Sequence, residues 1–483
     1  MRIAYISSES VPYASTGGLG DVAYSLPAAL RRGGLELIKV LPLYRKVWES
    51  GIRLSDTGMR FRLPLGFRLY TAEIWRHEAA DPPVYFVRRD EYFDRRELYS
   101  LPERDYDDNF ERFVFFQKAV VALLEVLDFR ADIVHCNDWQ TALIPLFLRH
   151  GLQGLGRSQS ERTVVTIHNL AYQGIFPGSE FGLTNLPFSC FGVDGMEFYG
   201  QINCLKAGIL AADRVITVSP TYADEIRTEA HGYGLDGVLR GIGNRLHGIL
   251  NGADYAVWNP ATDPHLPQPY TPENYEAGKA AAKRALLSRF GAGVENGLPL
   301  VGMICRLVDE KGLDLLAEAM PDLMSRPLRL ILLGAGMERY HQMTREWARR
   351  WPDRFSVTIG FDLALAHLIE AGSDLFLMPS RHEPCGLTQL YALKYGTLPI
   401  VHSVGGLKDT ICDLSPDGGS GNGFAFEDYT VPALLAAVDR ALGLFAQPAV
   451  WRIAARRAMA EDHSWGRSAA AYAEVYRQAL GAA

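Results

Sequence analysis

The chain has 483 residues, of which 48% are hydrophobic and 22% charged, proportions typical of a globular protein with an extensive core. Its formal net charge of −7 argues against a protein that binds nucleic acid along the phosphate backbone, because such a protein needs a basic face. No segment approaches the ~20 apolar residues of a membrane-spanning helix, so we expect no membrane association.

The cysteines and the amino terminus predict the compartment. The six cysteines are scattered, without a C-x-x-C pair or clustered histidines, which favours reduced thiols over disulfides or a metal site. The apolar run near the amino terminus spans four residues, whereas a signal peptide needs about 7–15. We therefore expect a cytoplasmic protein and interpret the first apolar run as a strand.

Short apolar runs alternate with helical stretches along the chain, which is the pattern of βα units on parallel sheets. In the first half, helices are expected at 21–31 and 109–127, and strands at 3–7, 38–41, 84–87, 133–136, 163–167, 214–218 and 245–250. A loop-rich junction with several prolines follows from 253 to 297, and a helix at 275–290 interrupts it.

A second series of strands begins after the junction. Its members are expected at 300–304, 328–333, 355–359, 375–378 and 398–401, and an amphipathic helix follows at about 465–480. Two successive α/β series predict two Rossmann-like domains that face each other across a cleft. We place the first domain at residues 1–252 and the second at 253–457.

The segment Ser15–Asp21 (STGGLGD) follows the first strand and opens a helix. Its adjacent glycines allow a tight turn whose backbone amides can face a diphosphate. Glycines alone are equally compatible with a sharp turn that binds nothing. We take Ser15, Gly18 and Asp21 as candidate substrate-binding residues.

Polar residues also follow later strands of the first domain. Asp138 lies in the string CNDW, and His168 and Asn169 lie in TIHN, so both strings should meet at the carboxyl edge of one sheet. A lone histidine at such a place is as often a neutral, hydrogen-bonded structural residue as a functional one. Asn251, just after the last strand of the series, is a further candidate.

Arg306 and Lys311 lie five residues apart in a strand-to-helix loop, so both can converge on one anion. A leaving group that departs as an anion gains negative charge as its bond breaks, and fixed cations stabilise that charge more than they stabilise the bound substrate. The alternative is a solvated pair beside Asp309 and Glu310. No metal would be needed if the two cations did this work.

Two further features follow in the second domain. The string Gly334-Ala-Gly336 suggests a dinucleotide site, but Arg339 replaces the third glycine of that motif, which weakens a nicotinamide oxidoreductase as an alternative. Phe361 follows the strand at 355–359 and is a candidate to stack on a base, although an aromatic residue there is more often part of the core.

The stretch from Arg381 to Gly396 is the most informative part of the chain. Glu383 should lie between the end of a buried strand and the start of a helix, where open α/β sheets bind ligands. A carboxylate there accepts hydrogen bonds from two adjacent hydroxyls and therefore suits a polyol, whereas an isolated Glu-Pro would more simply be an acidic first turn. The candidate loop also contains Cys385, Gly386, Leu387 and Thr388.

This stretch resembles, nearly residue for residue, the donor-sugar loop of the bacterial glycogen synthases and plant starch synthases. The string TIHNLAYQG, from Thr166 to Gly174, also matches that family closely, and the resemblance covers essentially the whole chain. It implies a cytoplasmic retaining glucosyltransferase of the GT-B fold that transfers glucose from ADP-glucose to the non-reducing end of an α-1,4-glucan such as glycogen, without a cofactor.

The resemblance also implies roles for individual residues. Arg306, Lys311, Glu383 and His168 would be catalytic, with His168 against the donor glucose and Asn251 reaching the sugar. The carboxyl-terminal helix, at 458–483, would cross back onto the first domain. Tyr391 occupies the position where many other sugar transferases have a second glutamate, which separates this chain from them.

One position departs from the family. Two residues before the paired glycines the family usually has lysine, and this chain has Ser15, which supplies a hydroxyl and no charge. A lysine there should strengthen donor binding unless a nearby cation already fills the gap. UDP-glucose or another donor therefore stays open as an alternative, as does an inactive glucan-binding scaffold. The sequence also leaves open whether the protein forms a homo-oligomer.

Overall fold

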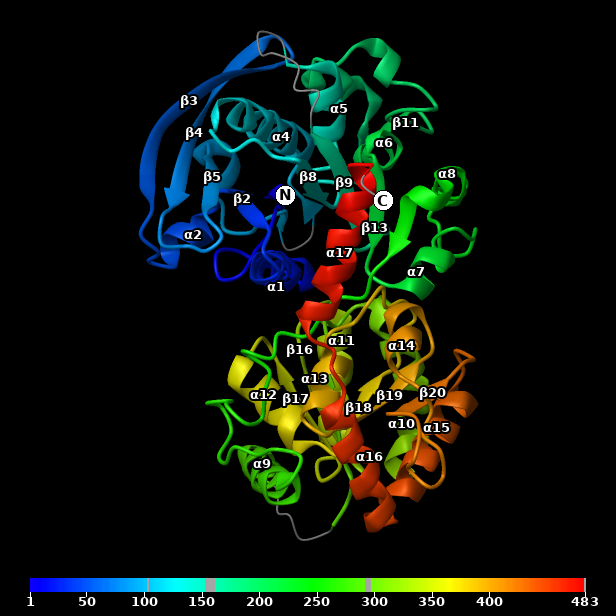
Figure 1. Cartoon of the computed structure of the whole chain (residues 1–483). Helices are drawn as coiled ribbons and strands as arrows, with labels where there is room; N and C mark the ends of the chain where they lie inside the picture. Colours follow the sequence, from blue (N-terminus) through cyan, green and yellow to red (C-terminus); the bar gives the residue numbers. More distant parts are fainter. Residues whose placement is uncertain (102–103, 153–160, 292–296, 482–483) are drawn as a thin grey trace. The chain divides into compact units, whose positions relative to one another are not determined.

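The computed structural model describes residues 1–101, 104–152, 161–291 and 297–481, and the chain divides into two compact units (Figure 1). Unit 1 comprises Met1–Asn251 and the chain from Trp465 onward, and unit 2 comprises Gly252–Ser464. The sequence predicted that the chain returns to the first domain from residue 458 onward. In the structure, residues 458–464 belong to unit 2. Helix α16 (Pro448–Ala460) packs there against α13 (Thr388–Lys394).

The sheet of unit 1 has the strand order β14-β13-β9-β8-β1-β2-β5-β4-β3. It is parallel from β14 to β5, while β4 and β3 continue it antiparallel. The strands expected from apolar runs are all present, with ends shifted by one or a few residues. The bounds are β1 Arg2–Ile6, β2 Glu36–Pro42, β3 Ser55–Leu65, β4 Arg68–His77, β5 Val84–Arg88, β8 Ile133–Asn137, β9 Arg162–Ile167, β13 Arg214–Thr217 and β14 Leu246–Gly248.

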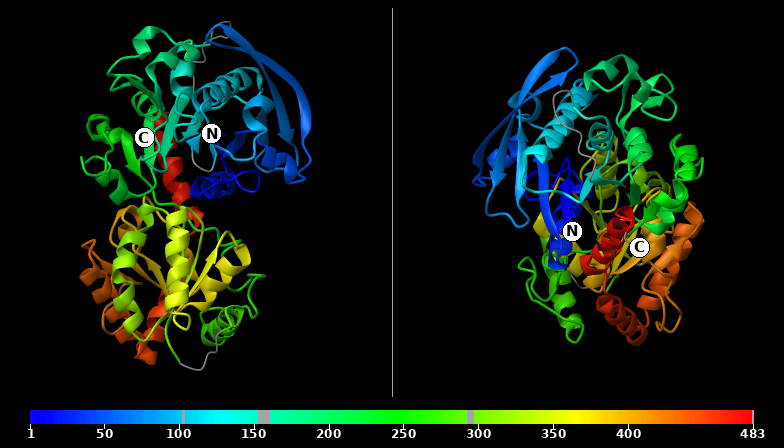
Figure 2. Two further views of the ribbon diagram at one scale, coloured as in Figure 1. Left: turned by 180° about the vertical axis from the view of Figure 1, so that it is seen from behind. Right: turned by 45° about the horizontal axis from the view of Figure 1, so that its top comes forward.

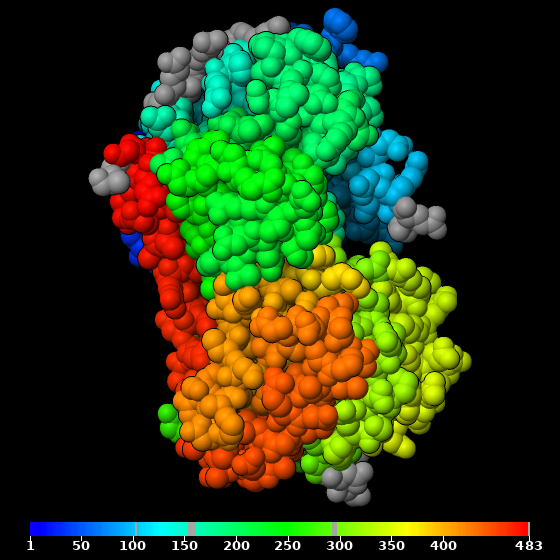
Figure 3. Space-filling view, turned by 90° about the vertical axis from the view of Figure 1, so that its right-hand side faces the viewer, coloured from blue at the N-terminus to red at the C-terminus, as the bar shows by residue number. Residues whose placement is uncertain are grey.

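Helices cover both faces of this sheet (Figures 1 and 2). On one face α1 (Gly18–Arg32) packs against α17 (Trp465–Ala479), and on the other α4 (Asn109–Val126) packs against α5 (Ile144–His150). Helix α17, red in Figure 3, lies on the surface of unit 1, and its Tyr472 and Tyr476 are buried in the hydrophobic core of that unit. The hydroxyl of Tyr476 lies 2.8 Å from Nδ1 of His135 on β8, which ties the end of the chain to this sheet.

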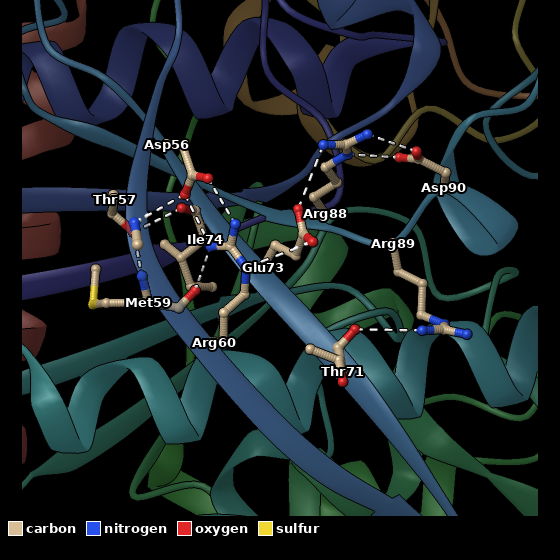
Figure 4. A network of polar contacts seen from close by, with 11 residues as sticks. Asp56, Thr57, Met59, Arg60, Thr71, Glu73, Ile74, Arg88, Arg89 and Asp90 are labelled. Atoms are coloured by element: carbon tan, nitrogen blue, oxygen red, sulfur yellow. Dashed lines mark hydrogen bonds and ion pairs between the residues drawn. The ribbon is translucent and has the colours of Figure 1, made fainter.

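The β3–β4 hairpin is not predicted by apolar runs, because its residues alternate between partly buried and exposed and many are charged. Figure 4 shows the polar network on its outer side, in which Arg60 pairs with Asp56 and Arg88 pairs with both Glu73 and Asp90. Ion pairs as exposed as these contribute little to the stability of the fold. The hairpin therefore depends mainly on pairing with β5 and on its inward residues.

Unit 2 contains a parallel sheet with the order β17-β16-β15-β18-β19-β20. Helices α10 (Leu313–Ser325) and α11 (Glu338–Arg350) cover the face seen from behind in Figure 2, while α9 (Tyr275–Arg289), α12 (Leu363–Gly372) and α13 cover the other. The three-residue β20 was not expected, since a run so short carries no periodicity. The strands are β15 Leu300–Ile304, β16 Arg329–Gly334, β17 Phe355–Ile359, β18 Leu375–Met378, β19 Leu398–His402 and β20 Phe424–Phe426.

Both parallel sheets are doubly wound, and in each the strand order reverses once along the chain. The reversal lies between β1 and β8 in unit 1 and between β15 and β18 in unit 2. At such a switch point the loops after two adjacent strands diverge, and open α/β sheets bind ligands there. In the described part of the chain no single helix is long and apolar enough to cross a membrane.

Candidate active site

The switch point of unit 2 brings together two residues that are far apart in the sequence. Lys311 ends the short turn η4 (Asp309–Lys311) after β15, and Glu383 follows β18. The Nζ of Lys311 lies 2.6 Å from Oε2 of Glu383, and the Ser380 hydroxyl donates to the same oxygen at 3.0 Å. The Glu383 side chain is only 8% exposed, so it is an ion-paired carboxylate held in one position.

Arg306 lies on the same loop as Lys311, and its side chain is about half exposed. Its guanidinium is 3.8 Å from the Glu310 carboxylate. Burial raises the pKa of the adjacent Cys305 to about 12, while the charges of Lys311 and Arg306 lower it and that of Glu383 raises it. Lys311, Glu383 and Arg306 therefore all lie near Cys305, in one small region.

Glycines allow the loops of this region to touch. Gly312 has a φ of 74°, and a Cβ there would collide with the carbonyl oxygen of Pro379. A Cβ on Gly405 would likewise collide with the Glu383 carbonyl, and the N–H of Gly406 donates to that carbonyl at 3.1 Å. The turn that carries Glu383 is thus clamped between the loop after β15 and the start of α14 (Gly405–Thr410).

Side chains of the turn after Glu383 contact the protein interior. Cys385 is buried, Leu387 packs against the cluster of Leu390 and Tyr391, and the Thr388 hydroxyl lies 3.4 Å from the Met378 sulfur. Gly386 has a φ of 74°, which favours glycine. What this turn can offer a ligand is therefore mainly its main chain.

Phe361 lies just beyond β17 and is 89% exposed. The sequence left open whether this ring belongs to the core, and the structure excludes that alternative. A large apolar ring in solvent at the carboxyl edge of a sheet is free to stack on a planar ligand.

The glycines at 334 and 336 have a packing role. A Cβ on either would collide with the backbone of Cys305 or Leu307, so these glycines let the loop after β16 lie against the loop after β15. Asp309 strengthens this contact by accepting from both Arg339 and Tyr340. Arg339, which breaks the dinucleotide motif, thus helps to fix the loop that carries Lys311.

In unit 1, the glycine-rich segment after β1 is held by a carboxylate that the motifs did not reveal. Glu9 is buried, and its oxygens accept from the Thr16 N–H at 2.5 Å and the Thr16 hydroxyl at 2.8 Å. The Tyr99 hydroxyl also donates to Glu9, at 2.8 Å. The signal in the sequence was a carboxylate directly after the first strand.

This support leaves the paired glycines open to ligands. Gly17 and Gly18 are exposed, and a Cβ built on either meets nothing within 4 Å. The Ser15 hydroxyl donates to the Gly17 carbonyl at 3.1 Å, and its side chain lies over Gly20. Asp21 lies exposed in the first turn of α1.

Asp138 and His168 meet at the other side of the same switch point. Asp138 has a φ of 54°, which is strained for a residue with a side chain, and Oδ1 accepts the His168 N–H at 2.8 Å. Burial raises the pKa of Asp138 to about 7. Asn169 lies beside His168, with its Oδ1 accepting the Ala171 N–H.

The hydrogen bonds of Asn137 determine the tautomer of His168. The Asn137 amide donates through Nδ2 to the Ile6 carbonyl at 2.8 Å, so its Oδ1, 2.9 Å from Nε2 of His168, must accept. Nε2 therefore carries the proton and Nδ1 is an acceptor. Burial lowers the pKa of His168 to about 3, so the ring is neutral at physiological pH.

Asn251 is buried at the end of unit 1, and its Oδ1 has no hydrogen-bond partner among the described residues. An unpaired buried acceptor costs ~1–3 kcal/mol, which a ligand hydroxyl or water can offset. The described residues contain no group of three or more His, Cys, Asp or Glu side chains that could hold a metal ion.

Comparisons with known proteins cover the whole chain. Residues 2–241 match a family model described as starch synthase catalytic domain, and residues 287–458 match one described as glycosyl transferases group 1. The chain is 47% identical over 479 residues to the glycogen synthase of Anaeromyxobacter dehalogenans and 42% identical over 480 residues to that of Syntrophotalea carbinolica, with 99% of each chain covered.

Solved structures show the same similarity. The catalytic domain of starch synthase IV from Arabidopsis thaliana, bound to ADP and acarbose, superposes with a TM-score of 0.90 at 33% identity over 99% of both chains. A sucrose-phosphate synthase from Thermosynechococcus elongatus, at 18% identity and a TM-score of 0.62, shares the fold alone.

Proposed function

The chain belongs to the glycogen synthase family of glycosyltransferases, and from that premise we propose that it transfers glucose from ADP-glucose to the non-reducing end of an α-1,4-glucan with retention of configuration. The matches confirm the expected glycosyltransferase class and GT-B fold. The choice of donor and the roles of individual residues belong to the proposal. The starch synthase relative bound to ADP and acarbose supports both a nucleotide and a glucan as ligands.

The buried ion pair of Lys311 and Glu383 at the unit 2 switch point carries the proposal. A carboxylate has about four acceptor positions, and Glu383 uses one oxygen for Lys311 and Ser380. The remaining positions suit adjacent hydroxyls of a glucosyl group. The Lys311 ammonium has further N–H donors for the phosphate that leaves with the nucleotide.

The reaction needs charge stabilisation more than a nucleophile. The bond from the anomeric carbon to the donor phosphate breaks as the bond to the 4-hydroxyl oxygen of the glucan forms on the same face. The leaving phosphate accepts the hydroxyl proton. Lys311 and Arg306 stabilise the negative charge that develops on the diphosphate, in a site where the low dielectric strengthens the attraction.

The proposal also assigns substrate contacts to residues of unit 1. Neutral His168 accepts a hydrogen bond from a sugar hydroxyl through Nδ1, and Asp138 holds its loop. Asn251 contributes its unpaired oxygen, and Phe361 of unit 2 stacks on the base. The other proposed substrate contacts are Ser15, Gly18, Asp21, Asn169, Cys385, Gly386, Leu387 and Thr388.

The deciding experiment measures nucleotide release from ADP-glucose and from UDP-glucose, each with and without glycogen. We expect release from ADP-glucose that depends on glycogen, with the new linkage in the α configuration by NMR. Faster release from UDP-glucose would identify the alternative donor that Ser15 leaves open. Glycogen binding without release from either donor would identify an inactive scaffold.

A further inference from the structure

Lys39 is a buried lysine on β2 that the proposed mechanism does not use. It is 4% exposed, and its Nζ donates to the Ser10 hydroxyl at 3.0 Å and to the Ala23 carbonyl at 3.2 Å. Within the described ranges no carboxylate pairs with it. Burial by itself lowers the pKa of Lys39 to about 7.

Two of the three other buried lysines among the described residues have three acceptors each. Lys118 donates to the carbonyls of Pro64 and Leu183 and to Oδ1 of Asn185, at 2.7, 3.1 and 2.8 Å. Lys279 in unit 2 also has three acceptors, at 2.6 to 3.2 Å. An ammonium has three N–H donors, and the described contacts of Lys39 use two of them.

Lys39 lies against the glycine-rich segment after β1. Ser10 exchanges backbone hydrogen bonds with Ala14, at 2.9 and 3.0 Å, and Ala23 lies one turn beyond Gly20 in α1. The ammonium thus joins the two ends of the segment that carries Ser15 and the exposed Gly17 and Gly18. The rings of Tyr13 and Tyr24, on the same segment, lie 5.7 and 5.9 Å from it.

We propose that Lys39 supplies the positive charge for anion binding at this segment, in place of the lysine that the family resemblance implies at position 15. The inference rests on the proposed function, in which Ser15 and Gly18 of this segment contact the substrate. A cation behind the amino terminus of α1 adds to the field of its free N–H groups. Because the ammonium is surrounded by protein, its field is weakly screened by solvent.

A purely structural role makes different predictions. If Lys39 only clamps Ser10 to Ala23, its loss should lower the melting temperature, and a lysine at position 15 should not restore donor binding. If Lys39 supplies charge, the two positions should compensate each other. Ser15 is partly exposed, so a longer side chain there has room to extend outward.

The test measures binding of ADP-glucose by calorimetry without glucan, so that no turnover occurs. We expect Lys39→Met to weaken binding about tenfold or more, and Ser15→Lys to restore most of it in the Lys39→Met background. Ser15→Lys in the wild-type background should change the Kd by less than about threefold. Lys118→Met, the matched buried lysine, should leave the Kd unchanged.

The pH profile gives a second readout. Wild-type affinity should fall as the pH rises from about 6 to 8.5, because Lys39 loses its proton near pH 7, whereas Lys39→Met should show a flat profile. The diphosphate of ADP-glucose does not titrate in this range. Tyr13 and Tyr24 face Lys39, and His77 contacts the Tyr13 hydroxyl. A pH dependence that persists in Lys39→Met would therefore come from another group and would overturn this part of the inference.

If Lys39→Met does not fold, Lys39→Gln removes the charge and keeps hydrogen-bond donors for Ser10 and Ala23. Tight ADP-glucose binding in a folded Lys39→Met or Lys39→Gln variant would refute the inference and leave the proposed function intact. Absence of ADP-glucose binding in the wild type would instead refute the proposed function, on which the inference rests.

Discussion

The ion pair between Lys311 and Glu383 makes the sharpest prediction about catalysis. We expect Lys311→Ala to reduce kcat by ~10²-fold or more, since removing one preorganised donor costs ~2.7–4 kcal/mol of transition-state stabilisation. Among the described residues, the substitution also leaves Ser380 as the remaining partner of the Glu383 carboxylate. The loss of stability should stay below the ~3–5 kcal/mol of a fully buried pair, because the Lys311 side chain is 19% exposed.

Unit 2 contains a closely matched control for this substitution. Lys283 pairs with Asp374 at the same 2.6 Å, with side chains 17% and 15% exposed, but Asp374 precedes β18 and so lies at the opposite edge of the sheet from Glu383. Lys283→Ala should therefore lower the melting temperature by a similar amount and leave kcat near the wild-type value.

The assay is the steady-state release of ADP from saturating ADP-glucose and glycogen, with the melting temperature of each variant measured in parallel. Added magnesium should not rescue Lys311→Ala, since a free ion does not reproduce an ammonium held against Glu383. Turnover of Lys311→Ala within about threefold of the wild type would refute the proposed role of this lysine. An equal loss of kcat in Lys283→Ala would show that destabilisation, and not lost charge, explains the effect.

Four further substitutions test other parts of the site. Glu383→Gln should keep ADP affinity but lower turnover, because an amide mispaired with glucose hydroxyls costs ~1–3 kcal/mol; weak ADP binding with normal transfer would contradict this role. Phe361→Ala should weaken ADP and ADP-glucose binding alike, by ~0.5–1.5 kcal/mol if the ring stacks on the base, with the melting temperature unchanged. Cys385→Ser should remain active, and a folded but inactive variant would make the thiol itself important. The folded chain keeps a proton on Asp138 up to about pH 7, whereas the unfolded chain releases it near pH 4. The free energy of unfolding should therefore fall as the pH rises from about 4 to 7. The melting temperature of Asp138→Asn should lack this dependence.

The sequence by itself determined most of the elements. The apolar runs at 300–304 and 375–378 match β15 and β18, since buried parallel strands are continuous apolar runs bounded by loops. The five-residue spacing within one loop likewise predicted that Arg306 and Lys311 can reach the same anion. The β3–β4 hairpin was not predicted, because its residues alternate and many are charged. It is stabilised by pairing with β5, and no local sequence pattern indicates that pairing.

Only the tertiary structure decided which loops meet. Lys311 and Glu383 are 72 residues apart, and they touch because β15 and β18 pair at the point where the strand order reverses. Lys39 is similar, since in the sequence it is one polar residue in an apolar strand, and only the packing of β2 beneath α1 brings it to Ser10 and Ala23. Local sequence sets backbone preference and the burial of one face, whereas adjacency depends on strand pairing and helix packing summed over the whole chain.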